Sequence, residues 1–112
     1  MATNWSTVLT DMLKAAEGVA KNEWPKLEGE AKAQFQVLTQ VGARIEARKL
    51  LNPPTISETN ARFLMNQYEM ASQNVLYSIE GLTNLLIEEV INAALEVLRT
   101  ALKSATGGWI LL

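Results

Sequence analysis

The stretch LNPPTISE, from Leu51 to Glu58, is the strongest helix-breaking signal in the 112-residue sequence. Two consecutive prolines, Pro53 and Pro54, cannot continue a helix, and each pushes the residue before it toward extended backbone geometry. Helix-forming residues dominate on both sides, so the stretch predicts a turn at residues 52–56 between two helical arms. Each arm has roughly 45 residues and is about 70 Å long if it is fully helical.

The start of the second arm carries two alternative helix caps. Thr55 and Glu58 have the spacing of a capping box, in which the hydroxyl accepts a hydrogen bond from the backbone three residues on and the carboxylate reaches back. Ser57 is a competing N-cap. The boundary is therefore defined to within about two residues, and we expect a long helix over about residues 57–103.

Apolar and small residues recur along the second arm at steps of three or four, which is the period of a helical face rather than of a strand. A second stripe repeats every seven residues and consists of Ile56, Phe63, Met70, Tyr77, Asn84, Ile91 and Leu98. Only Asn84 interrupts its apolar character, and a single polar residue at a core position can fix register and oligomeric state. Residues 58–80 are also rich in amides, at Asn60, Asn66, Gln67, Gln73 and Asn74.

The first arm contains two apolar stripes with a proline between them. They predict one helix over about residues 5–22 and another over about residues 25–51. Proline is tolerated in the first turn of a helix and kinks it elsewhere, so Pro25 either starts a new helix after a tight break or bends one long helix. If the two arms fold back on each other, Pro25 lies opposite Gly81, the helix-weakening glycine of the second arm.

These patterns predict an all-α protein with a single helical domain over residues 1–112. Because a short loop between long helices favours antiparallel neighbours, we expect a long helical hairpin of two or three helices, with a break near Pro25 and a turn at Asn52–Thr55. Residues 85–102 are apolar around most of their circumference and need cover from several sides. Dimerisation of two hairpins into a four-helix-type bundle supplies that cover, and a three-helix monomer is the alternative.

The predicted contact surface between copies is the apolar face of the last helix together with the tail GGWILL. Its residues are Leu86, Val90, Ile91, Leu95, Leu98, Leu102, Trp109, Ile110, Leu111 and Leu112. Gly107 or Gly108 suits the left-handed position that ends a helix. The tail after it either folds back over the end of the helices, near Trp5, as a lid, or docks onto another protein or another copy.

Composition argues against enzymatic function. The chain has neither cysteine nor histidine, which removes thiol chemistry, the commonest general base and the commonest metal ligand. It also lacks a P-loop and a Gly-x-Ser-x-Gly motif. We therefore expect a non-enzymatic structural or adaptor protein without a cofactor, which self-associates as a homodimer or higher oligomer. A carboxylate-only metal site among its glutamates is a further hypothesis.

Ten basic and twelve acidic residues leave a formal net charge of −2, which offers no broad basic face for nucleic acid. A small basic tip is expected near the turn, from Arg44, Arg48, Lys49 and Arg62, although cations also favour helix C-termini in general.

The most apolar stretch, residues 82–102, does not predict a transmembrane span. It contains Glu88, Glu89, Glu96 and Arg99, and each charge is costly near the centre of a bilayer. Amphipathic binding to a membrane or another hydrophobic surface is the alternative function, weakened by the acidic character of the polar face. The N-terminus does not resemble a signal peptide, so we expect a cytoplasmic protein.

Overall fold

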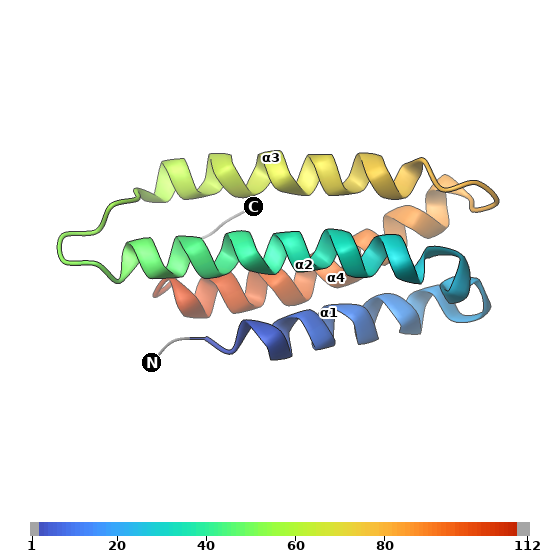
Figure 1. The fold of residues 1–112 in the computed structure, drawn as a ribbon, viewed down its shortest axis with the longest axis horizontal. Helices are drawn as coiled ribbons and strands as arrows, with labels where there is room; N and C mark the ends of the chain where they lie inside the picture. The colour runs from blue at the N-terminus through green and yellow to red at the C-terminus, as the bar shows by residue number, and fades with distance from the viewer. Residues whose placement is uncertain (1–2, 110–112) are drawn as a thin grey trace.

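The computed structural model describes residues 3–109, and every regular element among them is helical (Figure 1). The elements are α1 (Trp5–Ala20), the short 3₁₀ helix η1 (Lys21–Glu23), α2 (Trp24–Lys49), α3 (Glu58–Tyr77) and α4 (Asn84–Ala105). Successive α-helices run in opposite directions along the long axis of the molecule. The all-α prediction is confirmed, since residues 3–109 contain no β-strand.

The break near Pro25 is a full reversal of the chain rather than a bend in one helix. α1 ends at Ala20, and Lys21 then adopts a φ of 52°. η1 completes the reversal, and Pro25 is the second residue of α2, where its missing N–H costs no helical hydrogen bond. Of the two interpretations of Pro25, the new helix after a tight break is the correct one.

The double-proline turn connects α2 to α3, as predicted. Ser57 is the N-cap of α3, because its Oγ accepts a hydrogen bond from the Asn60 backbone N–H at 3.1 Å. Thr55 has a different role: its carbonyl oxygen accepts a hydrogen bond from Arg48 Nη2 at 2.8 Å. The capping-box interpretation of Thr55 is therefore wrong, and the competing cap at Ser57 is right.

A third reversal, at residues 78–83, corrects the prediction of one long helix over 57–103. Gly81 adopts a φ of +85°, a left-handed conformation that glycine reaches without steric cost. The Ser78 hydroxyl donates to a carbonyl oxygen of α3 at 2.6 Å, and Thr83 Oγ1 accepts from a backbone N–H of α4 at 3.1 Å. The Ser78 and Thr83 side chains thus form hydrogen bonds with backbone groups that lack a partner at the ends of α3 and α4. The described chain therefore folds as four α-helices instead of a hairpin of two or three.

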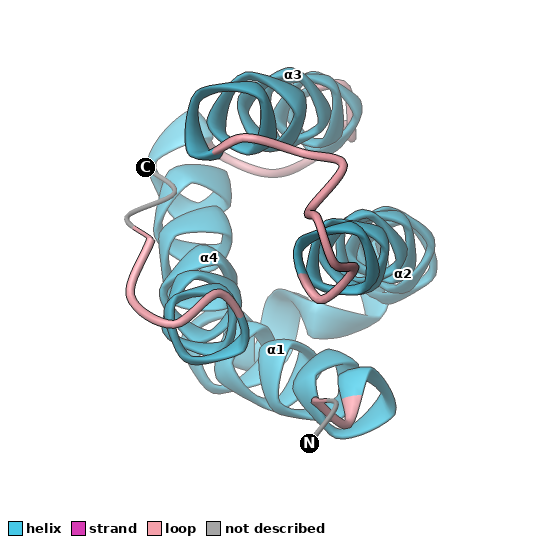
Figure 2. Ribbon diagram, turned by 90° about the vertical axis from the view of Figure 1, so that its left-hand side faces the viewer, coloured by secondary structure: helices cyan, strands magenta, loops and turns pink. Residues whose placement is uncertain are grey.

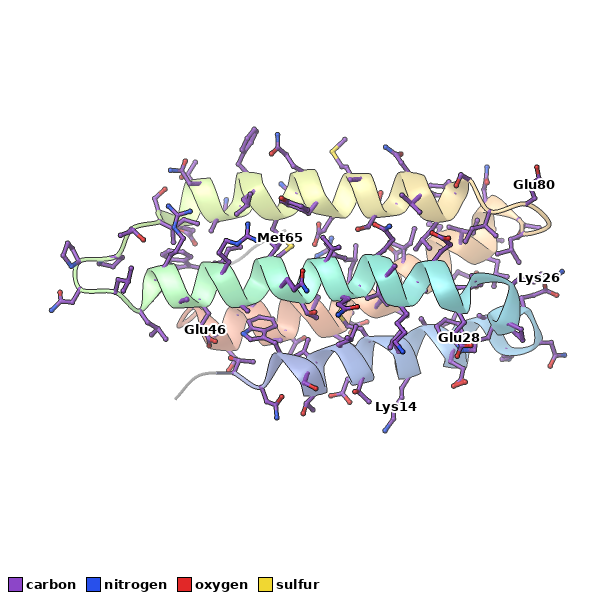
Figure 3. The ribbon with its side chains drawn as sticks, viewed as in Figure 1. Lys14, Lys26, Glu28, Glu46, Met65 and Glu80 are labelled. Carbon is purple, nitrogen blue, oxygen red and sulfur yellow. The ribbon has the colours of Figure 1, made fainter. Side chains whose placement is uncertain are left out.

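All four helices contribute side chains to one core. Figure 2 shows the four helices end-on. α1 packs mainly on α4 and α2, whereas α3 packs mainly on α2 and meets α4 over a shorter stretch. Met65 projects from α3 toward α2 and is fully buried there (Figure 3). α3 is consequently the least enclosed of the four helices. The largest fully buried side chains are Met12, Phe35, Leu38, Val41, Ile45, Met65, Leu76, Val90, Leu95, Leu98, Leu102 and Thr106.

The molecule is elongated, with extents of 48 × 23 × 19 Å along its principal axes. α4 ends at the same end of the molecule at which α1 begins. None of the helices in residues 3–109 has the length and apolar character needed to cross a bilayer.

Candidate interaction site

The apolar face of α4 is covered within the single chain. Five of the residues predicted to form an interface between copies are buried in the core, with exposed fractions between 0% and 4%; they are Val90, Ile91, Leu95, Leu98 and Leu102. Leu86 is half-buried and packs against the same core. This apolar face therefore needs no second chain to cover it, and self-association requires another surface.

The end of the chain is described only as far as Trp109, so the predicted contacts of Ile110, Leu111 and Leu112 lie outside the described residues. Trp109 is partly buried against the core. Lys49 Nζ lies 5.1 Å from the centroid of the Trp109 ring, within the range of a cation–π interaction. The described start of the tail thus contacts the C-terminal end of α2.

The seven-residue stripe is divided by the reversal at 78–83. On α4 its members Ile91 and Leu98 face the core. On α3 its members Phe63, Met70 and Tyr77 face outward, with exposed fractions of 64%, 64% and 38%. Asn84, predicted to be the polar residue of a continuous core seam, is instead the exposed first residue of α4.

The outward face of α3 combines this stripe with three of the amides. We call it the α3 seam, defined as Asn60, Phe63, Gln67, Met70, Asn74 and Tyr77, all of which are exposed. Their spacing alternates between three and four residues, so they line up along one side of the helix. Both the stripe and the amides are visible in the sequence, but their common outward direction follows only from the way α3 packs on α2.

The α3 seam lies on a face without exposed, unpaired charge. α3 contains three ionisable side chains of the Asp, Glu, Lys and Arg types: Glu58, Arg62 and Glu69. Glu58 and Arg62 pair with each other at the start of the helix, with Oε1 and Nη2 separated by 3.5 Å. Glu69 is buried. Surface helices usually carry charge on their solvent side, so an uncharged outer face with large apolar side chains is typical of a contact surface.

Beneath the α3 seam, Glu69 connects α3 to α4. Its Oε2 lies 3.6 Å from Arg99 Nη2, while Glu69 Oε1 and Arg99 Nε are buried without a hydrogen-bond partner. Burial raises the pKa of Glu69 above its ordinary value, and the opposing effect of Arg99 does not offset it. This loose ion pair is therefore a weak link between α3 and α4, which meet over only a short stretch.

Glu46, near the C-terminal end of α2, is also buried, but its carboxylate is fully engaged by hydrogen bonds. It faces the start of α1 (Figure 3). Its carboxylate accepts hydrogen bonds from the Thr3 backbone N–H at 3.1 Å, the Thr3 hydroxyl at 2.6 Å and Trp5 Nε1 at 3.0 Å. Burial raises the pKa of Glu46, but the hydrogen bonds from Thr3 and Trp5 outweigh burial and lower the pKa overall. The ionised carboxylate therefore clamps the N-terminal segment onto α2.

The predicted basic tip does not form one free positive patch. Arg48 donates to Thr55, Arg62 pairs with Glu58, and Lys49 lies over the Trp109 ring. Arg44 is exposed on α2. Three of the four predicted cations thus serve contacts within the chain, as cations near helix ends commonly do.

The carboxylates also remain dispersed. Within residues 3–109, no three side chains of the His, Cys, Asp and Glu types come close enough together to hold a metal ion. Glu46 and Glu69, the two buried glutamates, are engaged by Trp5 and Arg99 respectively. The geometry thus lends no support to a carboxylate-only metal site in the described part of the chain.

A groove of about 560 Å³ is lined by residues of α1 and α4. Its apolar lining includes Val8, Ala15 and Ala93, whose small side chains leave the space open. Asp11 and Glu96 also line it. This groove is acidic, which distinguishes it from the uncharged α3 seam.

Comparison of the chain with protein-family models, with curated proteins and with solved structures found no significant match. The fold itself defines the class of the molecule: it is an all-α protein of four antiparallel helices in which α3 carries an uncharged, partly apolar outer face.

Proposed function

We propose that this chain is a non-enzymatic structural or adaptor protein that self-associates through helical packing, and that the α3 seam is the contact surface. The observation that carries this proposal is the exposure of Phe63, Met70 and Tyr77, one every seven residues, on a face without unpaired charge. Large apolar side chains aligned on a polar protein surface are typical of sites that another molecule covers.

Covering the seam buries apolar surface, which favours association. Full burial of a side chain such as phenylalanine or methionine contributes about 1.5–3 kcal/mol relative to full exposure. In a symmetric pair, each copy supplies Phe63 and Met70, so four such side chains are buried along with both copies of Tyr77. Part of this gain is offset by the entropy lost on association.

The lack of histidine and cysteine supports the non-enzymatic part of the proposal. Glu46 and Glu69, whose pKa values are shifted in the folded chain, are both tied to partners inside the fold. Neither lines the groove between α1 and α4.

Multi-angle light scattering of the wild-type chain over a wide concentration range tests the proposal. We expect the mass to rise from the 12.4 kDa of one chain toward twice that value as concentration increases. A mass that stays at 12.4 kDa up to the solubility limit contradicts self-association.

Binding to a hydrophobic surface is the second candidate, since the same apolar side chains would insert into a lipid interface. The α3 seam lacks the flanking lysines and arginines that attract amphipathic helices to anionic membranes. Self-association therefore fits the seam better. Flotation with neutral phosphatidylcholine vesicles separates the two: co-flotation of a chain that stays monomeric in solution favours the lipid surface.

A further inference from the structure

We infer that the partner of the α3 seam is a second copy of this chain whose α3 lies parallel and in the same register. This inference rests on the proposed self-association and adds its geometry. The two helices would form a short coiled-coil contact in which each layer pairs a residue with its own copy.

The spacing of the seam is that of a coiled coil. Positions that alternate at steps of three and four are the a and d positions of a heptad, which form the contact line between two helices. Here the d positions are apolar and the a positions are amides. The d set is Phe63, Met70 and Tyr77, and the a set is Asn60, Gln67 and Asn74.

The alternation of amide and apolar layers selects the orientation. In a parallel pair, a faces a and d faces d, so Gln67 meets Gln67 of the other copy and Met70 meets Met70. Amides can hydrogen-bond to each other in such layers. In an antiparallel pair, a faces d, and every amide is buried against an aromatic ring or a methionine without a partner. An unsatisfied buried amide is costly, so the parallel arrangement is favoured.

The residues beside the seam permit this contact. Leu64 and Ala71 flank it on one side, and Asn66 and Gln73 flank it on the other. None of them is charged, so like charges do not face each other across the two-fold axis of a parallel pair. Uncharged flanks also give neither the parallel nor the antiparallel pair an electrostatic advantage, so the amide layers determine the orientation.

The contact leaves the fold of each copy intact. The side of α3 that packs on α2 is formed by Ala61, Met65, Ser72 and Leu76, which are already buried and lie opposite the seam. From Asn60 to Tyr77 the seam is about 26 Å long at about 1.5 Å per residue. That length gives three amide layers and three apolar layers.

Cysteine cross-linking tests the orientation directly, because the full chain contains no cysteine. The two reporters are Asn60→Cys, at one end of the seam, and Gln67→Cys, at its centre. Ala33→Cys, on the exposed side of α2, is the matched control. Each variant is treated with a short bifunctional thiol reagent, and its fold is checked by circular dichroism.

A parallel pair brings both copies of residue 60 together and both copies of residue 67 together. An antiparallel pair keeps the two copies of residue 67 within reach but separates the copies of residue 60 by about 26 Å. We therefore expect both Asn60→Cys and Gln67→Cys to give cross-linked dimer well above the Ala33→Cys level. Asn74→Cys, near the other end, repeats the test, because antiparallel packing separates its copies by about 17 Å.

The outcomes separate the inference from the proposal on which it rests. Cross-linking of Gln67→Cys alone overturns the parallel register and leaves self-association through the seam standing. Cross-linking of none of the three seam variants above the Ala33→Cys level overturns both.

Discussion

Trp5 and Glu46 join the first turn of α1 to the last turns of α2 through a 3.0 Å hydrogen bond from the indole Nε1 to Oε1. The indole ring also lies against the backbone of Gly42, where a Cβ atom would be only 2.7 Å and 2.8 Å from two ring carbons. The hydrogen bond holds the ring in place, and the missing side chain of Gly42 makes room for it. The two features together fix how closely α1 approaches α2.

Gly42→Ala is predicted to destabilise the fold. The new methyl group overlaps the Trp5 ring, and overpacking of this kind costs about 1–3 kcal/mol. This cost exceeds the gain of up to about 1 kcal/mol that alanine brings to a helix interior. Urea denaturation should show a lower free energy of unfolding than that of the wild type.

Gly29→Ala is the matched control, because Gly29 is also in α2 and a Cβ there meets nothing within 4 Å. It should stabilise the protein by roughly 0.5–1 kcal/mol. If both alanine variants raise the free energy of unfolding equally, the close packing of Trp5 on Gly42 is not as described.

Glu46→Gln is predicted to destabilise the fold by about 1.5–3 kcal/mol at neutral pH, because it removes the charge from a carboxylate that accepts hydrogen bonds from Thr3 and Trp5. The pKa of Glu46 is lowered in the folded chain, so its stabilisation is present above the unfolded pKa of about 4.3. It is lost as the pH falls through the folded pKa. The stability difference between wild type and variant should therefore shrink in acid, and a difference that is constant with pH would refute the clamp.

Glu69→Gln is predicted to stabilise the fold at neutral pH, because the raised pKa of Glu69 means that a neutral side chain is favoured over the ionised one, which Arg99 pairs only loosely at 3.6 Å. The pKa of Glu69 is raised in the folded chain, so ionisation destabilises the fold as the pH rises from the unfolded toward and above the folded pKa. In acid the wild-type carboxyl is protonated and the advantage of glutamine should disappear. A variant less stable than the wild type at pH 7 would show that the ion pair is net stabilising.

The turn positions illustrate how far the sequence alone leads. Pro53 and Pro54 exclude helix, so the central turn is predictable from local chemistry. Gly81 is also visible, but isolated glycines occur inside helices at a cost of only about 1 kcal/mol. The reversal at 78–83 depends on Ser78 and Thr83 capping the two ends, which becomes decisive only when α4 packs back on α1.

The candidate site was harder to predict for a related reason. α3 has two apolar faces, one with Ala61, Met65 and Leu76 and one with Phe63, Met70 and Tyr77. A stripe with one residue every seven is too narrow to cover α2, whereas the first face is broadened by half-buried neighbours. Packing thus selects the broader face and leaves Phe63 and Met70 exposed. The contact between Trp5 and Glu46 joins residues that are far apart in the chain, so no local sequence pattern predicts it.

The mass of Met70→Lys tests the central claim most directly, since a lysine at the middle of the α3 seam places like charges opposite each other in a pair. Leu85→Lys is the matched control, because Leu85 is 67% exposed at the start of α4 and lies outside the seam. At a concentration where the wild type is dimeric by light scattering, we predict that Met70→Lys is a folded monomer of about 12.4 kDa and Leu85→Lys remains a dimer. Equal masses for the wild type and both variants would contradict the assignment of the α3 seam as the surface of self-association.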